Sequence, residues 1–580
     1  MGHKPESKRN LVSDTDASVR SVIRIQTLIS LATGIWFIGV RNIAPWNSDW
    51  LLPTPNRLDH AVAQLNWEFF RNAPIFQWPP VLLPDLGAGW GTVYVPFSSG
   101  SLIGFPLRYF EFMLPRNFQF LGIWLMFSFG MLGYWSVRLV SRLTNDRLEL
   151  LAGSGLLICS PTIFYRIGVL GHFELSAHWL LFAAIYFYLD KNFIVKRWSV
   201  LCVVTLIVNI YLFVMVLGIF LATVVRHLQT SAHRKSILSN SLVVVGSSFI
   251  AFASCGFLEY RSNSQGLGFF RSNGAAFIYP NFTLGNSIAG SYSHVLNWSG
   301  LFTNRTFVAS EREGFNFLGS GVLVGLLLAC FLLLFNSKKV GLTRVNYLIP
   351  LLVVSAVLFA NALSQKIVIG RREVLEMPLP QSLIELRQIF RTGERFVWPI
   401  MYVLIFCLIA VMIKVLQRKR LPAILLFGIL AIQIFDSSGG ISESRRILHS
   451  HSTLQLIDAT HWSDLLAERS HIALVPTFDY IGDFRSPEIE AWLKDAKYFA
   501  LLKLAAMTES STNFSVTGRP VTEIVDRENR ALQSSLQTGN LDRGTIYVFA
   551  TQASWKDLRG KFSSTVNFEV RDGYFIAYSK

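Results

Sequence analysis

The chain has 580 residues, of which 51% are hydrophobic and only 16% are charged, and its mean hydropathy is +0.40. A soluble domain carries about 25% charged residues, so this composition excludes an ordinary soluble protein. The net charge of +16 comes from basic residues grouped in short segments between apolar runs. Such groups orient membrane proteins, and their distribution argues against nucleic acid as a partner.

In chain order, residues 1–21 are polar and charged, and no small-residue cleavage site follows them. They are predicted to be a cytoplasmic tail and not a cleaved signal peptide. Residues 22–439 contain repeated apolar runs of about 17 to 22 residues, the length that crosses about 30 Å of hydrocarbon. We therefore expect an α-helical polytopic membrane protein. Clear runs are Val22–Val40, Phe120–Val137, Leu238–Leu258, Leu318–Phe335, Tyr347–Leu363 and Phe396–Leu416.

The basic groups decide the expected orientation. If all of them face the cytoplasm, the run Trp198–Val225 must leave the membrane on the side where it entered. It is therefore predicted to be a hairpin of two half-depth helices that turns near Asn209-Ile210-Tyr211. With this hairpin, about eleven helices place every basic group inside. The long loops 41–117, 259–314 and 365–394 then lie on the outer, periplasmic face.

Residues 440–580 have a different pattern. Their apolar runs shorten to strand length at Ile472–Val475 and Thr545–Phe549, with amphipathic material between them. This alternation predicts a C-terminal periplasmic α/β domain. The five cysteines of the chain all lie inside apolar runs, so we expect neither disulfides nor a zinc site.

The first outer loop carries the most informative segment. At about 75 residues it is far longer than an ordinary connection. Its apolar residues Leu58, Val62, Leu65 and Phe69 have helical spacing, which predicts an amphipathic helix in the membrane interface. Asp59 stands at the N-terminus of this helix. It is either a general base towards a sugar hydroxyl or a helix cap.

Other segments have a functional and a structural interpretation. The glycine-rich stretch Leu86–Gly91 either approaches a ligand or forms a surface turn. Four ionisable residues at the outer ends of two apolar runs either line a polar cavity or reach the surface as pairs; they are Arg166, His172, Glu174 and His178. Arg391 and Arg395 form either a clamp for a lipid phosphate or interface anchors.

Several segments together resemble a bacterial family of uncharacterised polytopic membrane proteins grouped with the GT-C glycosyltransferase superfamily. They are spread over about residues 20–440, and their order and loop placement carry the likeness. The resemblance implies a GT-C-like bundle with an outward-opening active site. The matching pieces are Asp59-His60 through Trp67–Arg71, Phe118–Trp124, Tyr165-Arg166 with His172 and His178-Trp179, Glu313–Gly319, and Phe390–Pro399.

GT-C enzymes have an acidic residue shortly after the first span, which serves as the base or orients the acceptor. Asp59 matches this position best, and Asp49 is its rival because it lies nearer the membrane in sequence. His60 stands where some relatives have a second acid, so we predict no metal and no other cofactor. The expected substrate-binding residues are Arg71, Arg166, His172, Glu174, His178, Arg271, Glu313, Arg391 and Arg395.

The resemblance implies a membrane glycosyltransferase of the bacterial inner membrane. Its donor would be a sugar on a polyisoprenyl phosphate, a membrane lipid, and its acceptor a cell-envelope glycan or lipid-linked glycan. Arg391 or Arg395, helped by Arg166, would neutralise the lipid-phosphate leaving group. Two alternatives stay open: a transporter or flippase for a lipid-linked glycan, and a non-catalytic scaffold in polysaccharide assembly.

Overall fold

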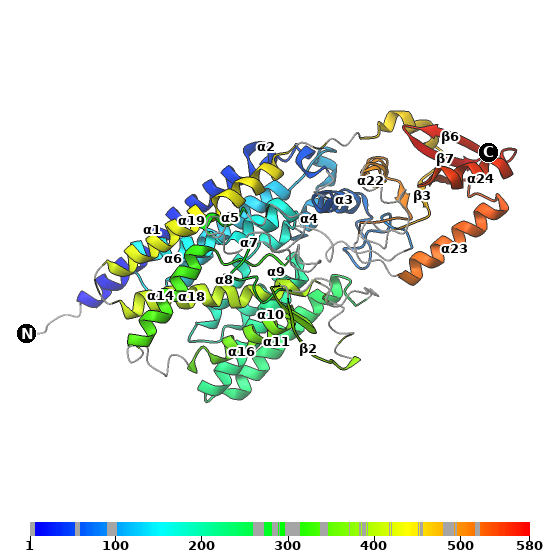
Figure 1. The fold of residues 1–580 in the computed structure, drawn as a ribbon. Coiled ribbons are helices and arrows are strands. Elements are labelled where there is room, and N and C mark those ends of the chain that lie inside the picture. The colour runs from blue at the N-terminus through cyan, green and yellow to red at the C-terminus, as the bar shows by residue number, and fades with distance from the viewer. Residues whose placement is uncertain are drawn as a thin grey trace, which may run out of the picture. The chain divides into compact units, whose positions relative to one another are not determined.

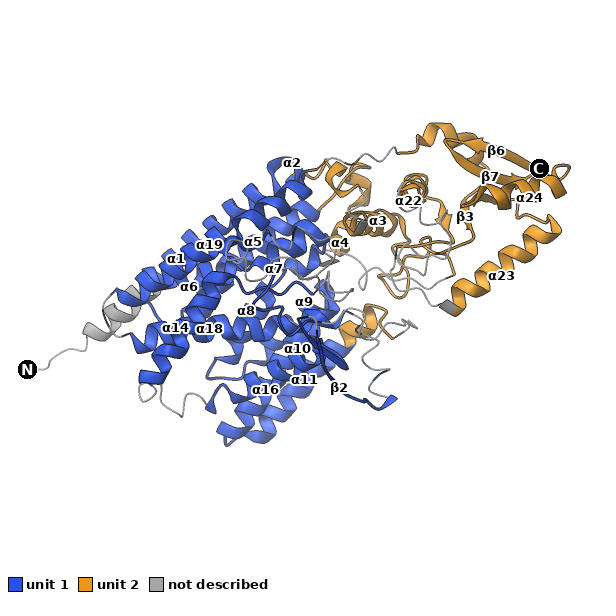
Figure 2. Cartoon of the chain, viewed as in Figure 1, with its two compact units in different colours: residues 1–43, 121–249, 266–449 blue, residues 44–120, 250–265, 450–580 orange. Residues whose placement is uncertain are grey.

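The computed structural model describes most of the chain. The described residues are 6–52, 58–89, 101–258, 272–280, 288, 291–295, 314–336, 346–370, 372–381, 384, 390, 392–416, 418, 420–450, 452, 456–478, 492, 496–516 and 522–580. They fall into two compact units, coloured separately in Figure 2. Unit 1 comprises residues 1–43, 121–249 and 266–449, and unit 2 comprises residues 44–120, 250–265 and 450–580.

Unit 1 is helical, as the blue-to-yellow helices of Figure 1 show. A two-stranded antiparallel ribbon, β1 (Lys366–Ile369) and β2 (Arg372–Glu376), accompanies the helices. The longer helices are α1 (Glu6–Ile38), α5 (Leu121–Val140), α6 (Arg147–Ile158), α8 (Trp179–Tyr188), α9 (Val195–Val208), α10 (Ile210–Thr230), α11 (Arg234–Ser254), α14 (Ser320–Asn336), α16 (Ile349–Leu363), α18 (Trp398–Val415) and α19 (Leu421–Leu448). The short ones are α2 (Val40–Ile43), α7 (Pro161–Tyr165), the π-helical turn η3 (Arg166–Leu170) and the 3₁₀ turns η4 (Glu174–Ser176) and η6 (Gly393–Val397).

Six helices among the described residues are long and apolar enough to cross a membrane, or seven if the bent pair formed by residues 147–158 and 161–170 is one span. The shorter apolar helices α14 and α16 accompany them. Unit 1 therefore has the character of a helical membrane-embedded protein, as the composition indicates. The total of eleven helices and the side on which each loop lies stay predictions.

The hairpin predicted for residues 198–225 is present. α9 ends at Val208 and α10 begins at Ile210, with Asn209 between them in an extended conformation. The rings of Trp198 and Phe220 lie 5.4 Å apart, although both are eleven residues from the turn, so the two arms run back along one another. The arms are unequal, because α10 has 21 residues and meets the length of a full span. α10 is therefore longer than the short arm that the sequence predicts, and the depth of the hairpin in a membrane stays a prediction.

Small residues allow the helices of unit 1 to approach closely. A Cβ added at Gly133 of α5 would lie 2.7 Å from the Cα of Thr27 in α1, and one added at Gly321 of α14 would lie 2.4 Å from the carbonyl oxygen of Ile429 in α19. Small residues serve this purpose between membrane helices, where the hydrophobic effect does not drive association. Polar contacts add to the second pair, since the buried Asp436 of α19 accepts a hydrogen bond from the Ser320 backbone N–H of α14 at 3.1 Å.

Unit 2 contains a mixed sheet of five strands in the order β4-β3-β5-β7-β6, in which β4, β3 and β5 are parallel. The strands predicted at 472–475 and 545–549 are the neighbours β3 and β5, so the α/β prediction is confirmed. The strands are β3 (His471–Val475), β4 (Ser511–Thr512), β5 (Thr545–Phe549), β6 (Val566–Arg571) and β7 (Tyr574–Ser579). The helices are η1 (Asp49–Leu51), α3 (Leu58–Asn72), α4 (Ser101–Arg108), η2 (Glu111–Met113), η7 (Ala459–Trp462), α20 (Ser463–Leu466), α22 (Lys497–Met507), α23 (Thr522–Thr538) and α24 (Gln552–Phe562).

Residues 44–120 fold together with the C-terminal domain. The glycine-rich stretch runs along the edge strand β4: the Thr512 N–H donates to the carbonyl oxygen of Asp85 at 2.8 Å, and the Gly87 N–H donates to Thr512 Oγ1 at 3.3 Å. Gly87 and Gly89 have φ values of 62° and 87°, which glycine adopts at no steric cost. The backbone of the described part of the stretch therefore hydrogen-bonds to strand β4 of the same chain.

The last long helix of unit 1 crosses residue 440, where the sequence pattern changes. The helix α19 continues without a break through residues 440–448, and unit 1 ends at residue 449. Residues 437–446 are rich in serine, glycine and charge, so the hydropathy falls before the helix ends. The helix end follows backbone hydrogen bonding and not hydropathy.

Candidate functional site

Three helices of unit 1 begin at the same place. His178 precedes α8, and Asn209 caps α10 by accepting a hydrogen bond from the Tyr211 N–H at 2.9 Å. The turn η6 and α18 form one continuous helix that begins at Gly393 and contains Trp398. The ring of His178 lies 4.3 Å from that of Trp398, and the Thr392 N–H just before η6 donates to the Tyr211 hydroxyl at 3.2 Å. N-terminal ends of helices carry partial positive charge, so their meeting favours an anion.

Arg166 lies fully buried beside this meeting point. It is the first residue of η3, and π-helical turns occur frequently at functional sites. Its guanidinium lies 5.4 Å from the ring centroid of Trp398, and its Nη1 atom lies 3.5 Å from Nδ1 of His172. Gly171, in the left-handed conformation at φ 70°, turns the chain so that His172 follows Arg166 closely.

His178 is also fully buried. Its Nδ1 atom is hydrogen-bonded to the hydroxyl of Tyr402, one turn into α18, and its ring packs against that of Trp398 at an interplanar angle of 35°. The Nε2 atom has no hydrogen-bond partner in the described part of the chain. An imidazole held in this way can donate or accept one further hydrogen bond.

Arg395 and Glu174 approach the same place from other elements. Arg395, almost fully buried in η6, lies with its guanidinium 4.8 Å from the ring centroid of Tyr211. Glu174 Oε1 accepts a hydrogen bond from Asn209 Nδ2 at 3.5 Å. The structure thus brings together five of the nine predicted substrate-binding residues: Arg166, His172, Glu174, His178 and Arg395.

Besides predicted residues, the site contains Tyr211, Trp398 and Tyr402, which the sequence pattern did not single out as site residues. We name the set Arg166, His172, His178, Tyr211, Arg395, Trp398 and Tyr402 the arginine–aromatic cluster. Its aromatic members lie at helix starts inside apolar runs, where each is an ordinary core residue by sequence. Glu394, fully buried next to Arg395, was also missed. The available signal was its acidic side chain at the border of an apolar run.

The cluster gathers hydrogen-bond donors among aromatic rings. Two buried guanidinium groups, a partly buried imidazole and three helix N-termini supply positive potential and N–H donors. A buried arginine is costly unless it is compensated, and the aromatic rings beside both arginines supply cation–π attraction. The guanidinium and imidazole groups are donors of the kind that phosphate oxygens accept, and the carboxylates of Glu174 and of the buried Glu394 lie among the same elements and offset part of their charge.

The acidic residues predicted to be catalytic belong to unit 2. Asp49 is exposed and begins η1, and Asp59 is partly exposed in the first turn of α3. His60 is fully buried. The predicted helix is therefore confirmed, whereas its predicted position in the membrane interface is not: residues 60–71 are buried on every face.

Arg71 organises the loop that follows α4. It donates hydrogen bonds to the carbonyl oxygens of Leu114 at 3.0 Å and Pro115 at 2.9 Å, and it pairs with Glu111 at 3.2 Å. Its planar guanidinium suits several acceptors at once. These contacts assign Arg71 to the support of this loop.

Within unit 2, α3 also carries a buried ion pair that sequence inspection missed. The Glu68 carboxylate pairs with Lys503 of α22 and accepts a second hydrogen bond from Gln64 Nε2 at 2.8 Å. Asn72 Nδ2 donates to the carbonyl oxygen of Ala506 at 2.9 Å. No local pattern could join positions more than 400 residues apart.

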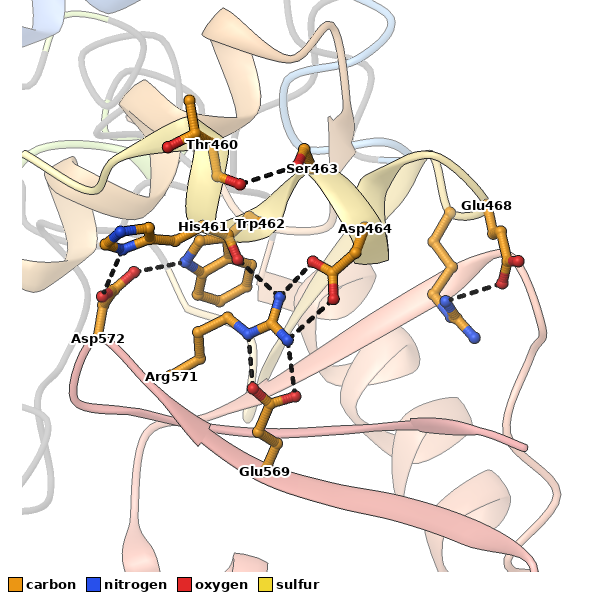
Figure 3. Close-up of polar contacts among 10 residues, drawn as sticks. Thr460, His461, Trp462, Ser463, Asp464, Glu468, Glu569, Arg571 and Asp572 are labelled. Carbon is orange, nitrogen blue, oxygen red and sulfur yellow. Dashed lines mark hydrogen bonds and ion pairs between the residues drawn. The ribbon is translucent and has the colours of Figure 1, made fainter.

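A second polar network ties the C-terminal hairpin of unit 2 to η7 and α20 (Figure 3). Arg571 forms a bidentate pair with Asp464 and also bonds Glu569, while Asp572 accepts from Trp462 Nε1 at 2.9 Å. The Arg571 hydrogen bond holds the pKa of Asp464 below its usual value. The donors and acceptors drawn here pair with one another, which is typical of a structural clamp.

Three predicted residues, Arg271, Glu313 and Arg391, lie outside the described residues. Within the described ranges there is no group of three or more His, Cys, Asp or Glu side chains that could hold a metal ion. The prediction of no metal stays a prediction.

Two family models match the chain. The first, described as "Domain of unknown function (DUF6311)", covers residues 27–438, and the second, described as "DUF6311 C-terminal domain", covers residues 461–579. No curated protein matches the chain. The two matched ranges leave out the last part of α19 and the start of the C-terminal region.

Proposed function

The chain belongs to the DUF6311 family, and we propose that it is a membrane glycosyltransferase. It moves a sugar from a polyisoprenyl-phosphate donor to a cell-envelope glycan acceptor on the periplasmic face of the bacterial inner membrane. The observation that carries the proposal is the arginine–aromatic cluster, in which buried Arg166 and Arg395 meet the N-termini of three apolar helices. The resemblance to GT-C enzymes supplies the reaction class.

In the proposed reaction, the acceptor oxygen attacks the anomeric carbon of the donor sugar. The bond between that carbon and the phosphate oxygen breaks, and the lipid phosphate leaves with the electron pair. Arg166 and Arg395 neutralise the charge that develops on the phosphate. A lipid phosphate is a good leaving group, so positioning and charge stabilisation supply most of the catalysis.

Asp59 is the proposed base and takes the proton of the acceptor hydroxyl. Its assignment rests on the GT-C resemblance and on its partly exposed position at the start of α3. Asp49 remains the rival, since it is also exposed in unit 2. The proposed topology has the basic groups of unit 1 in the cytoplasm and unit 2 in the periplasm, where an envelope glycan is accessible.

The test compares envelope polysaccharide from cells that lack the gene and carry either the wild-type chain or a variant. Asp59→Asn should abolish addition of the sugar, whereas Asp49→Asn should retain it. Arg166→Gln should lower transfer by about 10²- to 10³-fold because a transition-state donor is lost. Arg166→Lys keeps the charge without the planar fork, so its transfer rate should lie between those of the wild-type chain and Arg166→Gln. Arg446→Gln at an exposed ion pair is the matched control.

Each alternative predicts a different result. A transporter variant would leave the sugar on its lipid and change only the side on which the lipid-linked glycan accumulates. A scaffold would tolerate all four substitutions while the chain still inserts. Unchanged transfer by Asp59→Asn, with loss in Asp49→Asn, would move the base to Asp49.

A further inference from the structure

Unit 2 carries large apolar side chains that face outward. We name this set the aromatic patch; it consists of Ile75, Phe76 and Trp78 after α3 and of Tyr109, Phe110, Phe112 and Met113 after α4. Phe76 is 98% exposed and Phe112 is 81% exposed. Soluble proteins rarely expose so many large apolar side chains together, and such patches mark interaction surfaces.

Arg108 joins the two segments of the patch. The guanidinium of this buried side chain donates hydrogen bonds to the carbonyl oxygens of Pro80 at 2.9 Å and Ala73 at 2.8 Å, and also to that of Pro74. It also lies 4.5 Å from the ring centroid of Phe70 on α3. Since one side chain bonds three carbonyl groups of the neighbouring segment, the two segments lie next to each other.

Arg71 fixes the second segment from the inside. It holds Glu111 by an ion pair and the Leu114 carbonyl by a hydrogen bond. The loop side chains between and beside these anchors, Phe110, Phe112 and Met113, are exposed. The buried arginines thus hold the backbone while the apolar side chains face outward. These contacts are typical of an ordered surface and not of a frayed loop.

We propose that the aromatic patch inserts into the headgroup region of the lipid bilayer and anchors unit 2 to the membrane surface. Its composition fits this occupant. Tryptophan and tyrosine concentrate at the membrane–water interface, because one end of each ring system is apolar and the other is polar. Phe76, Phe112 and Met113 supply apolar area for the acyl boundary.

The covalent path of the chain supports the same occupant. Met113 lies eight residues before Leu121, where the apolar helix α5 begins, and eight residues of extended chain reach at most about 28 Å. Asn117 Nδ2 donates to the carbonyl oxygen of Trp46, and Gln119 Nε2 donates to that of Ala44 at 2.8 Å. Residues 44–46 directly follow α2, and Trp46 is itself 67% exposed. Both ends of this region therefore connect within a few residues to helices of the apolar unit.

This anchor differs from the interface helix that the sequence predicts. The apolar residues of α3 from Ala61 onward are buried inside the protein, so they are not available to lipid. The patch uses the segments that follow α3 and α4 instead. The proposal does not depend on the transferase reaction, because it concerns only the surface of unit 2 and the lipid.

The test places an environment-sensitive fluorophore on the patch of the full-length chain. Phe76→Cys and Phe112→Cys are made separately in a background in which the five native cysteines are replaced, and Lys556→Cys on α24 is the exposed control. Each labelled chain is reconstituted into vesicles of phosphatidylethanolamine and phosphatidylglycerol. Quenching is then measured with lipids that carry a nitroxide near the headgroup and, separately, with aqueous iodide.

The proposal expects strong nitroxide quenching and weak iodide quenching at positions 76 and 112, with the reverse at position 556. Iodide quenching at 76 and 112 equal to that at 556 would overturn it. Protection from both quenchers would also overturn it, because the patch would then be covered by protein. Energy transfer between differently labelled copies at position 112, in that case, would identify a second copy of the chain as the occupant.

Discussion

At the scale of single residues, side chains of the same type have different roles. Arg71 and Arg166 are both arginines beside apolar sequence, and both were predicted to bind substrate. Arg71 bonds carbonyl groups of its own chain, whereas Arg166 lies between an imidazole and the Trp398 ring. The difference is set by which groups surround each guanidinium. Only the folded chain defines those neighbours.

His471 gives a prediction for the stability of unit 2. It is the first residue of β3, with Nδ1 at 2.8 Å from Ser511 Oγ, and burial lowers its pKa below the ordinary 6.5. Because the folded pKa lies below the unfolded one, neutral His471 stabilises the fold above pH 6.5, and this contribution is lost as pH falls through the folded pKa. Unit 2 should therefore become more sensitive to protease as the pH falls from 7.5 to 5.

The measurement is the rate at which protease cleaves unit 2 in the purified full chain. His471→Gln should remove most of the change in rate between the two pH values. His461→Gln, at a largely exposed histidine of the same domain, should keep it. Equal acid sensitivity in the His471→Gln chain would contradict the assignment.

At the scale of elements, the sequence identifies helices and strands better than their surroundings. The spacing of Leu58, Val62, Leu65 and Phe69 correctly predicts α3. It also suggests one lipid-facing side, yet α3 packs against α22 and its polar residues Gln64 and Glu68 are buried. Amphipathic periodicity reports an apolar face, but it does not report that protein covers the polar face as well.

The pairing of α3 with α22 should depend on the ion pair between Glu68 and Lys503. Glu68→Gln leaves the Lys503 ammonium without its charge partner in a buried setting, which costs about 3 kcal/mol or more. Replacing both residues, as Glu68→Gln with Lys503→Met, should recover most of the loss. The quantity measured is the free energy of unfolding of unit 2 by pulse proteolysis of the full chain.

The exposed pair Lys561–Asp557 supplies the control. Asp557→Asn there should change stability by less than about 1 kcal/mol, because exposed ion pairs contribute little. If Glu68→Gln has an effect no larger than Asp557→Asn, the ion pair does not stabilise the contact between α3 and α22.

At the scale of the whole molecule, the order of residues along the chain differs from the order of the folded units. Residues 44–120 lie between two helices of unit 1 and yet fold with residues 450–580. Hydrogen bonds from Thr512 to Asp85 and from Asn72 to Ala506 hold the two stretches together. The C-terminal region thus completes the fold of the first long loop.

Cleavage of the chain after α19 should therefore leave the C-terminal fragment bound to the rest of the chain, because it folds with residues 44–120. With a protease site inserted at Ser452, in the connection after α19, the cleaved C-terminal fragment should copurify with the rest of the chain. Ending the chain at residue 449 removes α22 and β4, and residues 58–89 should then become sensitive to protease. A cleaved fragment that separates, or a loop that stays protected in the shortened chain, would contradict this view of unit 2.

The sequence by itself determined what local composition and period encode: the membrane character, α3, the hairpin at Asn209, and the strands β3 and β5. Those features depend on neighbours within about 20 residues, so their pattern is visible in one dimension. The tertiary structure decided the arginine–aromatic cluster, the burial of α3, the ion pair between Glu68 and Lys503 and the exposed aromatic patch. Each of these depends on side chains that meet only after distant segments pack, and hydropathy cannot report which atoms then surround a charge or an aromatic ring.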